Sequence, residues 1–144
     1  ANDLLAAVEQ VNDATFTAEE KADLSGQAYF LRALAYFDLV RTWGGVPLVL
    51  TPTRDFGPDV FTGRAPADVV YAQVLADLGE AETRLPDRTN RFVTTRKAAQ
   101  ALRARVALYR QDWAAAERYA TLLIASPEHE LVTPYERFLA EKGT

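Results

Sequence analysis

The sequence predicts an all-α fold, an array of helix pairs interrupted by one long loop that contains proline and glycine. Three observations support this prediction. Apolar residues recur at helical spacing over most of the 144 residues, and no run alternates as a strand requires. Capping residues precede these segments, and glycine or proline follows them. The composition, 49% hydrophobic and 25% charged, is that of one folded globular domain.

Two helices are expected before the loop, over residues 3–12 and 17–42. The short first helix has Asn2 or Asp3 as its cap. Thr17 precedes the second helix as its N-cap, and a glutamate three residues later completes a capping box. A Gly-Gly pair then ends this helix, because glycine readily adopts the positive φ found just past a helix end.

Residues 43–65 form the long loop, which contains three prolines and four glycines. A connection of this length is unusual in a compact domain and is typically functional. Pro66 opens the next helix, expected over residues 66–85, because proline fits the first helical turn. Asp68 lies in that turn, where a carboxylate interacts favourably with the helix dipole.

The next two helices are expected over residues 95–110 and 112–126, joined by a very tight turn. A threonine caps the first of them, and Asp112 opens the second. Together they form an αα-hairpin in which small residues let the helices approach closely and Trp113 fills the groove between them. A further helix is expected over residues 134–141.

The helix over residues 17–42 carries three charged residues among its aromatic side chains: Arg32, Asp38 and Arg41. Its rings lie on two sides, which indicates a helix packed between neighbours. The three charges are therefore expected to be partly buried and to need partners, because an unpaired buried charge is destabilising. Asp38 and Arg41 are three residues apart and can pair with each other.

The hairpin reads KAAQALRARVALYRQDWAAAERYATLLIASP. Its small-residue first helix, Asp-Trp turn and alanine-spaced second helix ending at proline resemble a tetratricopeptide unit. The helices over residues 17–42 and 66–85 are candidates for a second such pair. The resemblance implies a tetratricopeptide-like, α-solenoid-type array in which residues 1–144 form a single helical domain.

Three segments in order carry a more specific resemblance: AYFLRALAYFDLVRTWGGVPLVL, RAPADVVYAQVLADLGEAETRLP and TTRKAAQALRARVALYRQDWAAAERYATLLI. The first is an alanine- and aromatic-rich helix with an internal arginine that runs into Trp-Gly-x-Val-Pro-Leu. The other two segments contain the dipeptides Val-Tyr, Asp-Leu, Leu-Pro, Ala-Ala, Leu-Tyr and Asp-Trp. This order of motifs resembles the SusD/RagB family of outer-membrane lipoproteins, from about Asn2 to Phe138.

The resemblance implies a glycan- or nutrient-binding subunit of an outer-membrane polysaccharide uptake system, which binds rather than catalyses. Such a subunit sits over a TonB-dependent SusC-like transporter on the extracellular face of the outer membrane, held by a lipid anchor in the full-length protein. This chain is then expected to be a fragment of a larger protein, its helical scaffold, and the oligosaccharide site can lie outside it. The absence of methionine agrees with a fragment.

A sugar site within this chain is expected near the long loop. An aromatic ring exposed on a loop packs against the apolar face of a pyranose, while polar side chains bind its hydroxyls. The candidate rings are Trp43, Phe56 and Phe61, and the candidate polar partners are Arg54, Asp55 and Asp59. The alternative for Trp43, and the commoner situation, is that it packs the helix end.

No catalytic constellation is predicted, and the chain is interpreted as a non-enzyme. Asp77, Glu80 and Glu82 offer a conceivable glycosidase pair, but carboxylates on an amphipathic helix usually form a solvated face. The single histidine, His129, is expected on the surface between two glutamates, and cysteine is absent. Neither a metal site nor a cofactor is therefore predicted.

Arg96, Arg103 and Arg110 are seven residues apart and line one stripe of their helix. Nucleic acid is not expected as a partner, because the net charge is −4 and the acidic helix over residues 66–85, together with Glu117, can pair with the stripe. The rival function is a free-standing tetratricopeptide-like, peptide-binding adaptor in which the stripe clamps a peptide carboxylate.

Overall fold

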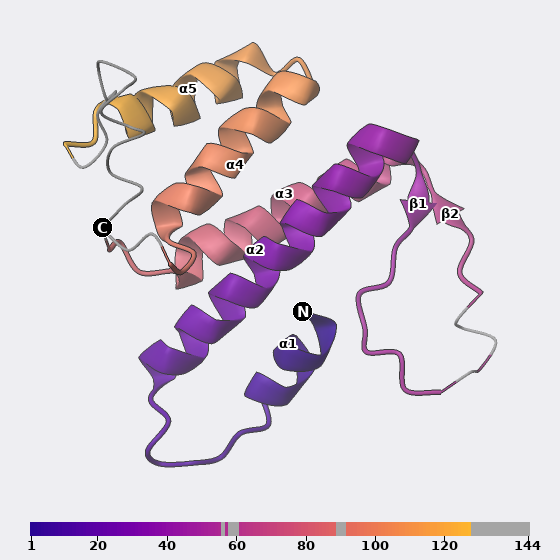
Figure 1. The fold of residues 1–144 in the computed structure, drawn as a ribbon, viewed down its shortest axis with the longest axis vertical. Coiled ribbons are helices and arrows are strands. Elements are labelled where there is room, and N and C mark those ends of the chain that lie inside the picture. The colour runs from indigo at the N-terminus through magenta and orange to yellow at the C-terminus, as the bar shows by residue number, and fades with distance from the viewer. Residues whose placement is uncertain (56, 58–60, 89–91, 128–144) are drawn as a thin grey trace, which may run out of the picture.

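The computed structural model describes residues 1–55, 57, 61–88 and 92–127, and within them the chain is helical, as predicted (Figure 1). The elements, in order, are α1 (Asn2–Val8), α2 (Ala18–Trp43), β1 (Val46–Pro47), β2 (Arg64–Ala65), α3 (Ala67–Arg84), α4 (Arg96–Tyr109) and α5 (Trp113–Ile124). In this described part, no helix is long and apolar enough to span a bilayer. The helix expected over residues 134–141 and His129 lie outside the described residues.

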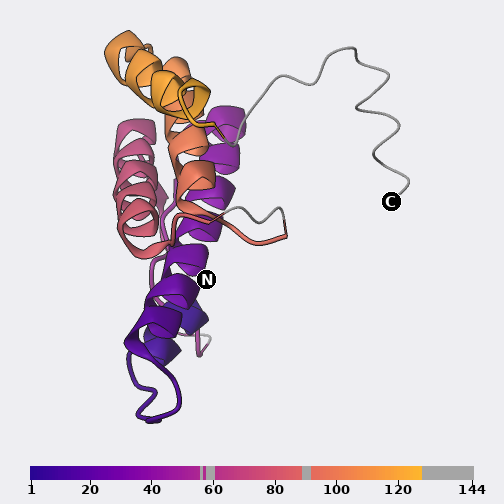
Figure 2. The same ribbon diagram turned by 90° about the vertical axis from the view of Figure 1, so that its left-hand side faces the viewer.

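The helices form two antiparallel pairs, α2 with α3 and α4 with α5 (Figure 1). Viewed from the side, α2, α3 and α4 lie next to one another, and α5 crosses one end of that layer (Figure 2). The short helix α1 packs on α2. Antiparallel helix pairs that stack on their neighbours are the unit of a tetratricopeptide-like array, so the predicted pairing is confirmed.

The hydrophobic core lies where α2, α3 and α4 meet. Phe37 of α2, Leu78 of α3 and Val106 of α4 are each 0% exposed at its centre. A smaller cluster of Ala81, Leu85 and Ala99 joins α3 to α4 near the other end of α3. Every helix of this layer therefore buries one face against both of its neighbours, which fixes their relative positions.

The predicted helix ends are found where the capping chemistry placed them. Thr17 Oγ1 accepts a hydrogen bond from Glu20 N (3.1 Å), and Glu20 Oε2 accepts one from Thr17 N (2.9 Å), which completes the capping box. Gly44 follows α2 with a φ of 69°. Thr95 caps α4, and Asp112 caps α5 through its side-chain oxygen.

The start of the chain corrects the prediction. The first helix ends at Val8 rather than at residue 12, and Ala1, not Asn2 or Asp3, occupies its N-cap position. The Asn2 side chain instead donates hydrogen bonds to Val49 O (2.9 Å) and to the carbonyl of residue 51 (3.1 Å). Asn2 resembles a capping residue in the sequence, but its hydrogen-bond partners lie in the distant loop.

The α4–α5 hairpin also differs from the expectation. Trp113 does not fill the groove between the helices, because its side chain points outward and is 64% exposed. The buried aromatic of α5 is Tyr119, at 6% exposure, and Ala116, three residues earlier, is also buried. Periodicity predicts the helix correctly, but it places Trp113 rather than Tyr119 on the face toward α4.

Candidate functional site

The long loop is closed at its base by a short neck that the sequence did not predict. β1 and β2 pair antiparallel, with Val46 opposite Ala65 and Pro47 opposite Arg64. The Arg64 guanidinium donates to Trp43 O (2.6 Å) and to Gly45 O (2.7 Å). This arginine therefore satisfies carbonyls at the C-terminus of α2 and holds both ends of the loop together.

Gly45 is required at the neck, because a Cβ atom placed on it would overlap the carbonyl oxygen of Ala65. The variant Gly45→Ala is expected to force the two strands apart and to lower the free energy of unfolding by about 1–3 kcal/mol. Denaturant unfolding at an unchanged m-value measures the loss. The control is Gly63→Ala, where nothing lies within 4 Å; equal stabilities of the two variants would contradict the tight neck.

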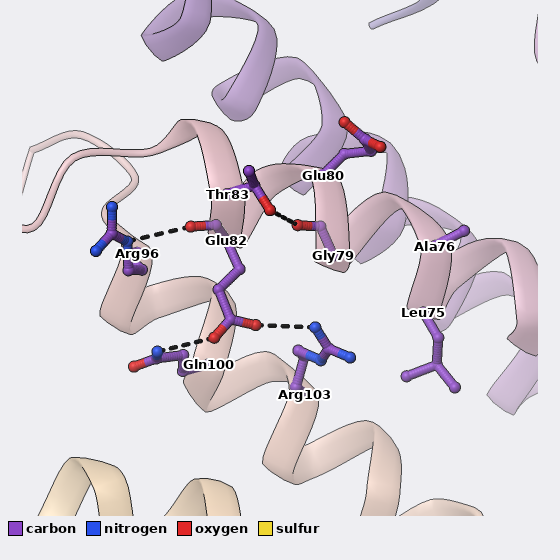
Figure 3. A pocket seen from close by; sticks show the side chains of 9 residues that line it. All are labelled: Leu75, Ala76, Gly79, Glu80, Glu82, Thr83, Arg96, Gln100 and Arg103. Carbon is purple, nitrogen blue, oxygen red and sulfur yellow. Dashed lines mark hydrogen bonds and ion pairs between the residues drawn. The ribbon is translucent and has the colours of Figure 1, made fainter.

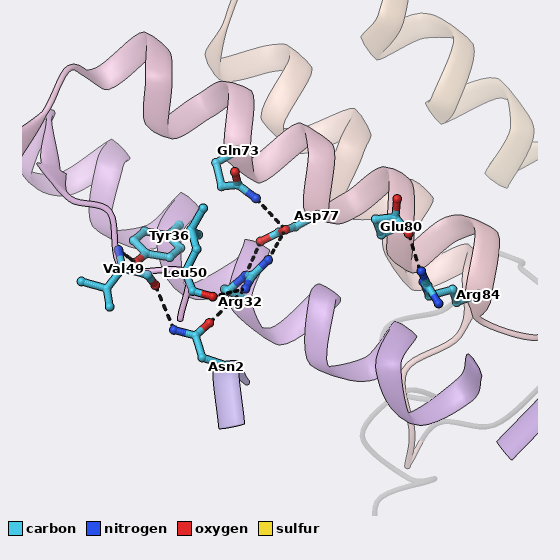
Figure 4. A network of polar contacts seen from close by, with 9 residues as sticks. All are labelled: Asn2, Arg32, Tyr36, Val49, Leu50, Gln73, Asp77, Glu80 and Arg84. Carbon is cyan, nitrogen blue, oxygen red and sulfur yellow. Dashed lines mark hydrogen bonds and ion pairs between the residues drawn. The ribbon is translucent and has the colours of Figure 1, made fainter. Parts of the chain in front are cut away.

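The first part of the loop is fixed to α1 and α2 by buried polar groups (Figure 4). The Tyr36 hydroxyl donates to Val49 O (2.9 Å) and accepts from Val49 N (2.7 Å), as a strand partner would. Arg32 Nη1 donates to the side-chain oxygen of Asn2 (3.0 Å) and to Leu50 O (3.3 Å). The loop therefore starts from a rigid base rather than from a free helix end.

The same Arg32 side chain forms a bidentate ion pair with Asp77 of α3, at 2.8 Å from Nε and 2.7 Å from Nη2. Gln73 Nε2 also donates to the Asp77 carboxylate (2.8 Å). The side chains of Arg32 and Asp77 are only 11% and 2% exposed. The hydrogen bonds to Asp77 raise the pKa of Arg32 and outweigh the opposite effect of burial.

This pair confirms one prediction and corrects another. Arg32 is largely buried and partnered, as expected. Arg41 pairs with Asp38 at 2.9 Å, also as expected, but both residues are exposed rather than partly buried. Asp77, however, does not belong to a solvated face of its helix. Both of its oxygens are occupied in the interior, and Glu80 pairs with Arg84 on the surface. The arrangement therefore does not resemble two carboxylates facing a substrate.

The predicted sugar-site residues lie in different places. Trp43 is the last residue of α2, and its side chain is 61% exposed. Arg54 pairs with Asp3 of α1 (3.1 Å), and both side chains are largely exposed, as is Asp55. Phe56 and Asp59 lie outside the described residues, and Phe61 is 87% exposed.

Trp43, Arg54 and Asp55 form no hydrogen bond or ion pair with one another in the described structure. Arg54 is held at α1, beside the Asn2–Arg32 contact. Arg32 precedes Trp43 by eleven residues, which corresponds to about 16 Å along the helix axis. The ring and the polar candidates therefore sit at opposite ends of the loop base.

A groove of about 730 Å³ runs between α3 and α4 (Figure 3). Its polar centre is Glu82, which accepts from Gln100 (2.9 Å) and from Arg103 (2.8 Å). Arg96 Nε donates to the Glu82 carbonyl oxygen (3.1 Å). The expected pairing of the arginine stripe with the acidic helix is thus observed for Arg103. Because Glu82 already pairs with this guanidinium, Arg103 is not available to bind a peptide carboxylate.

Among the described residues, no three histidine, cysteine, aspartate or glutamate side chains come together as a cation site would require. The side chains with exposed, sugar-compatible surface are the rings at the loop and at the helix ends. Exposed aromatic rings and guanidinium groups are therefore the candidate contacts for a ligand.

Paired antiparallel helices with a long loop anchored at its base define a tetratricopeptide-like scaffold. The SusD-like family model described as "Starch-binding associating with outer membrane" matches residues 1–108. The chain belongs to this SusD-like family, and the resemblance seen in its motifs is confirmed.

Relatives and solved structures agree with this assignment. A SusD-like protein of Formosa agariphila is 39% identical over 108 residues, which are 75% of this chain and 22% of that protein. A SusD-like protein of Bacteroides ovatus is 26% identical over 154 residues, covering 99% of this chain and 28% of the relative. The chain thus spans well under a third of the length of these relatives.

Two solved structures share the fold closely. A laminarin-binding SusD-like protein superimposes with a TM-score of 0.85 at 26% identity, over 96% of this chain and 31% of that one. A SusD superfamily protein from Bacteroides thetaiotaomicron gives 0.84 at 25% identity, over 95% of this chain and 32% of that one. The tetratricopeptide-like helix array is therefore the arrangement that such proteins use.

Proposed function

We propose that this chain is the helical scaffold of a glycan-binding subunit in an outer-membrane polysaccharide uptake system. The observation that carries the proposal is the SusD-like family match over residues 1–108. The close fold of a laminarin-binding SusD-like protein supports it. Within this role the protein binds an oligosaccharide and passes it on rather than cleaving it.

The partner in this proposal is a TonB-dependent SusC-like transporter, and the location is the extracellular face of the outer membrane, with a lipid anchor on the full-length protein. The outer faces of the helix pairs would dock on the transporter, as the surfaces of repeat scaffolds commonly do. Support comes from the family description, which associates its members with the outer membrane.

The native protein, recovered from the membrane fraction of the source cell, tests the location and the partner. Mass spectrometry of the intact protein and its N-terminus is expected to show a lipidated species much larger than 15.9 kDa that co-purifies with a large barrel protein. A native product near 15.9 kDa without lipid, found in the soluble fraction, would contradict the proposal and favour the peptide-binding adaptor.

The sugar contact proposed within this chain is the ring of Trp43, with Phe56 as a second ring. Arg54 and Asp55, at the other end of the loop base, are the proposed polar partners for a further unit of the same oligosaccharide. The rigid neck and the Tyr36 anchor hold the loop base in one conformation. A preformed base lowers the entropy lost when a ligand orders the loop. The proposal therefore assigns recognition to the loop and rigidity to the helices beneath it.

The variant Trp43→Ala is expected to weaken binding of a laminarin oligosaccharide to the full-length native protein about tenfold, because a stacked aromatic ring contributes about 1–1.5 kcal/mol. Isothermal titration calorimetry measures the affinity. Trp113→Ala is a matched control, since both tryptophans are similarly exposed, at 61% and 64%, and Trp113 lies on the α4–α5 hairpin. An equal effect of both variants, or none in either, would remove Trp43 from the site.

A further inference from the structure

An aromatic cluster near the C-terminal end of α2 is surrounded by guanidinium groups. Its centre is Phe37, fully buried, with the ring of Tyr109 edge-on at 5.2 Å between centroids. The Arg41 guanidinium carbon lies 5.9 Å from the Phe37 ring centre, and that of Arg105 lies 6.0 Å from it. Two cations from different helices are therefore brought to the same ring.

A third arginine extends this surface along the end of α4. The Arg110 guanidinium carbon lies 5.8 Å from the ring centre of Tyr71, which in turn packs edge-on against Phe37 at 6.5 Å. We define the arginine–tyrosine patch as the four residues Arg41, Arg105, Tyr109 and Arg110. It combines side chains of α2 and of the end of α4, which lie far apart in the sequence.

The patch is only partly neutralised by its neighbours. Arg41 pairs with Asp38 (2.9 Å), a carboxylate that is itself 52% exposed. No carboxylate of the described residues pairs with Arg105 or Arg110. Arg103, six residues before the last residue of α4, differs because it pairs with Glu82. The patch is therefore a local positive surface on a chain with a net charge of −4.

Tyr109 gives the patch a flat face as well as charge. Its side chain is 51% exposed, and Arg41 Nη1 approaches its hydroxyl at 3.5 Å. Arg41 chiefly, with a smaller effect of Arg105, lowers the pKa of Tyr109. Arg41 therefore lies beside the phenol oxygen, and Arg105 lies over the neighbouring Phe37 ring, so both guanidinium groups border the accessible ring of Tyr109.

We propose that the arginine–tyrosine patch binds an acidic saccharide, with its sulfate or carboxylate groups on the arginines of the patch and a sugar ring on Tyr109. Planar guanidinium forks match both kinds of anion, whereas a neutral glycan gains little from three cations. The inference rests on the proposed glycan-binding role and adds to it a second surface and a class of glycan. It leaves Trp43 as the contact for neutral sugar rings.

Three oligosaccharide probes test the patch on the full-length native protein: carrageenan fragments with sulfate, oligogalacturonate with carboxylate, and neutral laminarin fragments. The variant Arg105→Gln is expected to weaken binding of at least one acidic probe about tenfold and to reduce its salt dependence. Laminarin binding should not change. Whichever acidic probe responds more identifies the anion.

The matched control is Arg118→Gln, which removes one positive charge from an exposed arginine of α5 outside the patch. Equal weakening in Arg105→Gln and Arg118→Gln would overturn the inference, because net charge alone would then explain binding. Stronger patch-dependent binding of an acidic peptide than of either acidic probe would also overturn it, in favour of a protein partner.

The acidic-saccharide patch and the glycan-binding role predict different binding results. Binding of laminarin without binding of either acidic probe would overturn the patch and leave the glycan-binding role in place. Absence of binding to every saccharide probe would count against both. A second variant, Arg110→Gln, shows whether the effect is confined to Arg105. It is expected to weaken acidic-probe binding and to leave laminarin binding unchanged. Unchanged affinity for the acidic probes in both variants would overturn the inference.

Discussion

Replacing Asp77 by asparagine is expected to lower the free energy of unfolding by about 3 kcal/mol. The amide keeps the shape of the carboxylate but removes the negative charge that two nitrogens of Arg32 contact at 2.7 and 2.8 Å. It also brings a donor group to the site where Arg32 and Gln73 both donate. The buried guanidinium would then keep its desolvation penalty without the attraction that offsets it.

Denaturant unfolding compares this variant with Glu80→Gln, the same chemical change three residues further along α3. Glu80 is 49% exposed and pairs with Arg84 at the helix surface, so its replacement should cost less than about 0.5 kcal/mol. A loss for Asp77→Asn no larger than for this control would contradict the structural role. In the double variant Arg32→Met, Asp77→Leu we expect most of the stability to return, because an apolar pair needs no desolvation.

The variant Phe37→Ala is expected to cost about 3–5 kcal/mol, because a fully buried ring at the meeting point of three helices leaves a cavity that its neighbours fill poorly. The ring contacts of Tyr71 and Tyr109 are lost with it. Denaturant unfolding measures the loss, and Leu31→Ala on the same helix is the control, since Leu31 is 56% exposed. A cost below about 1.5 kcal/mol would mean that α2, α3 and α4 do not share one core.

The milder variant Phe37→Leu separates stability from recognition. Leucine keeps the site apolar, so most of the stability should remain. It removes the ring face that lies beneath Arg41 and Arg105. We therefore expect acidic-saccharide affinity to fall in a folded protein, while laminarin affinity stays. Unchanged affinity for acidic saccharides would show that Phe37 does not position the patch.

Much of the fold could be predicted because it depends on local chemistry. The capping box at Thr17, the positive φ of Gly44 and the caps of α4 and α5 follow from residues within one turn of each boundary. The apolar periodicity placed α3 and α4 within about two residues of their observed bounds. The family motifs lie on these same helices, so the sequence alone is enough to show the resemblance.

The candidate site was less predictable, because its contacts join distant segments. Asn2 looked like a helix cap, but its side chain holds the loop at Val49. The neck between β1 and β2 is too short to show a strand pattern, and Arg64 carries no signal for the helix end that it caps. Helical spacing places Arg103 and Arg110 on one stripe of α4, yet Arg103 pairs with Glu82 while Arg110 lies over Tyr71.

The sequence by itself determined which segments are helices, where most of them end and which family the chain resembles, since capping and periodicity act between residues in neighbouring turns. It also showed that Arg32 needs a partner. Only the tertiary structure decided that this partner is Asp77, that Tyr119 rather than Trp113 is buried, and which of the described arginines lack a carboxylate partner. Burial and ion pairing are set by which helix faces meet, and that choice is made across the whole fold rather than within any one segment.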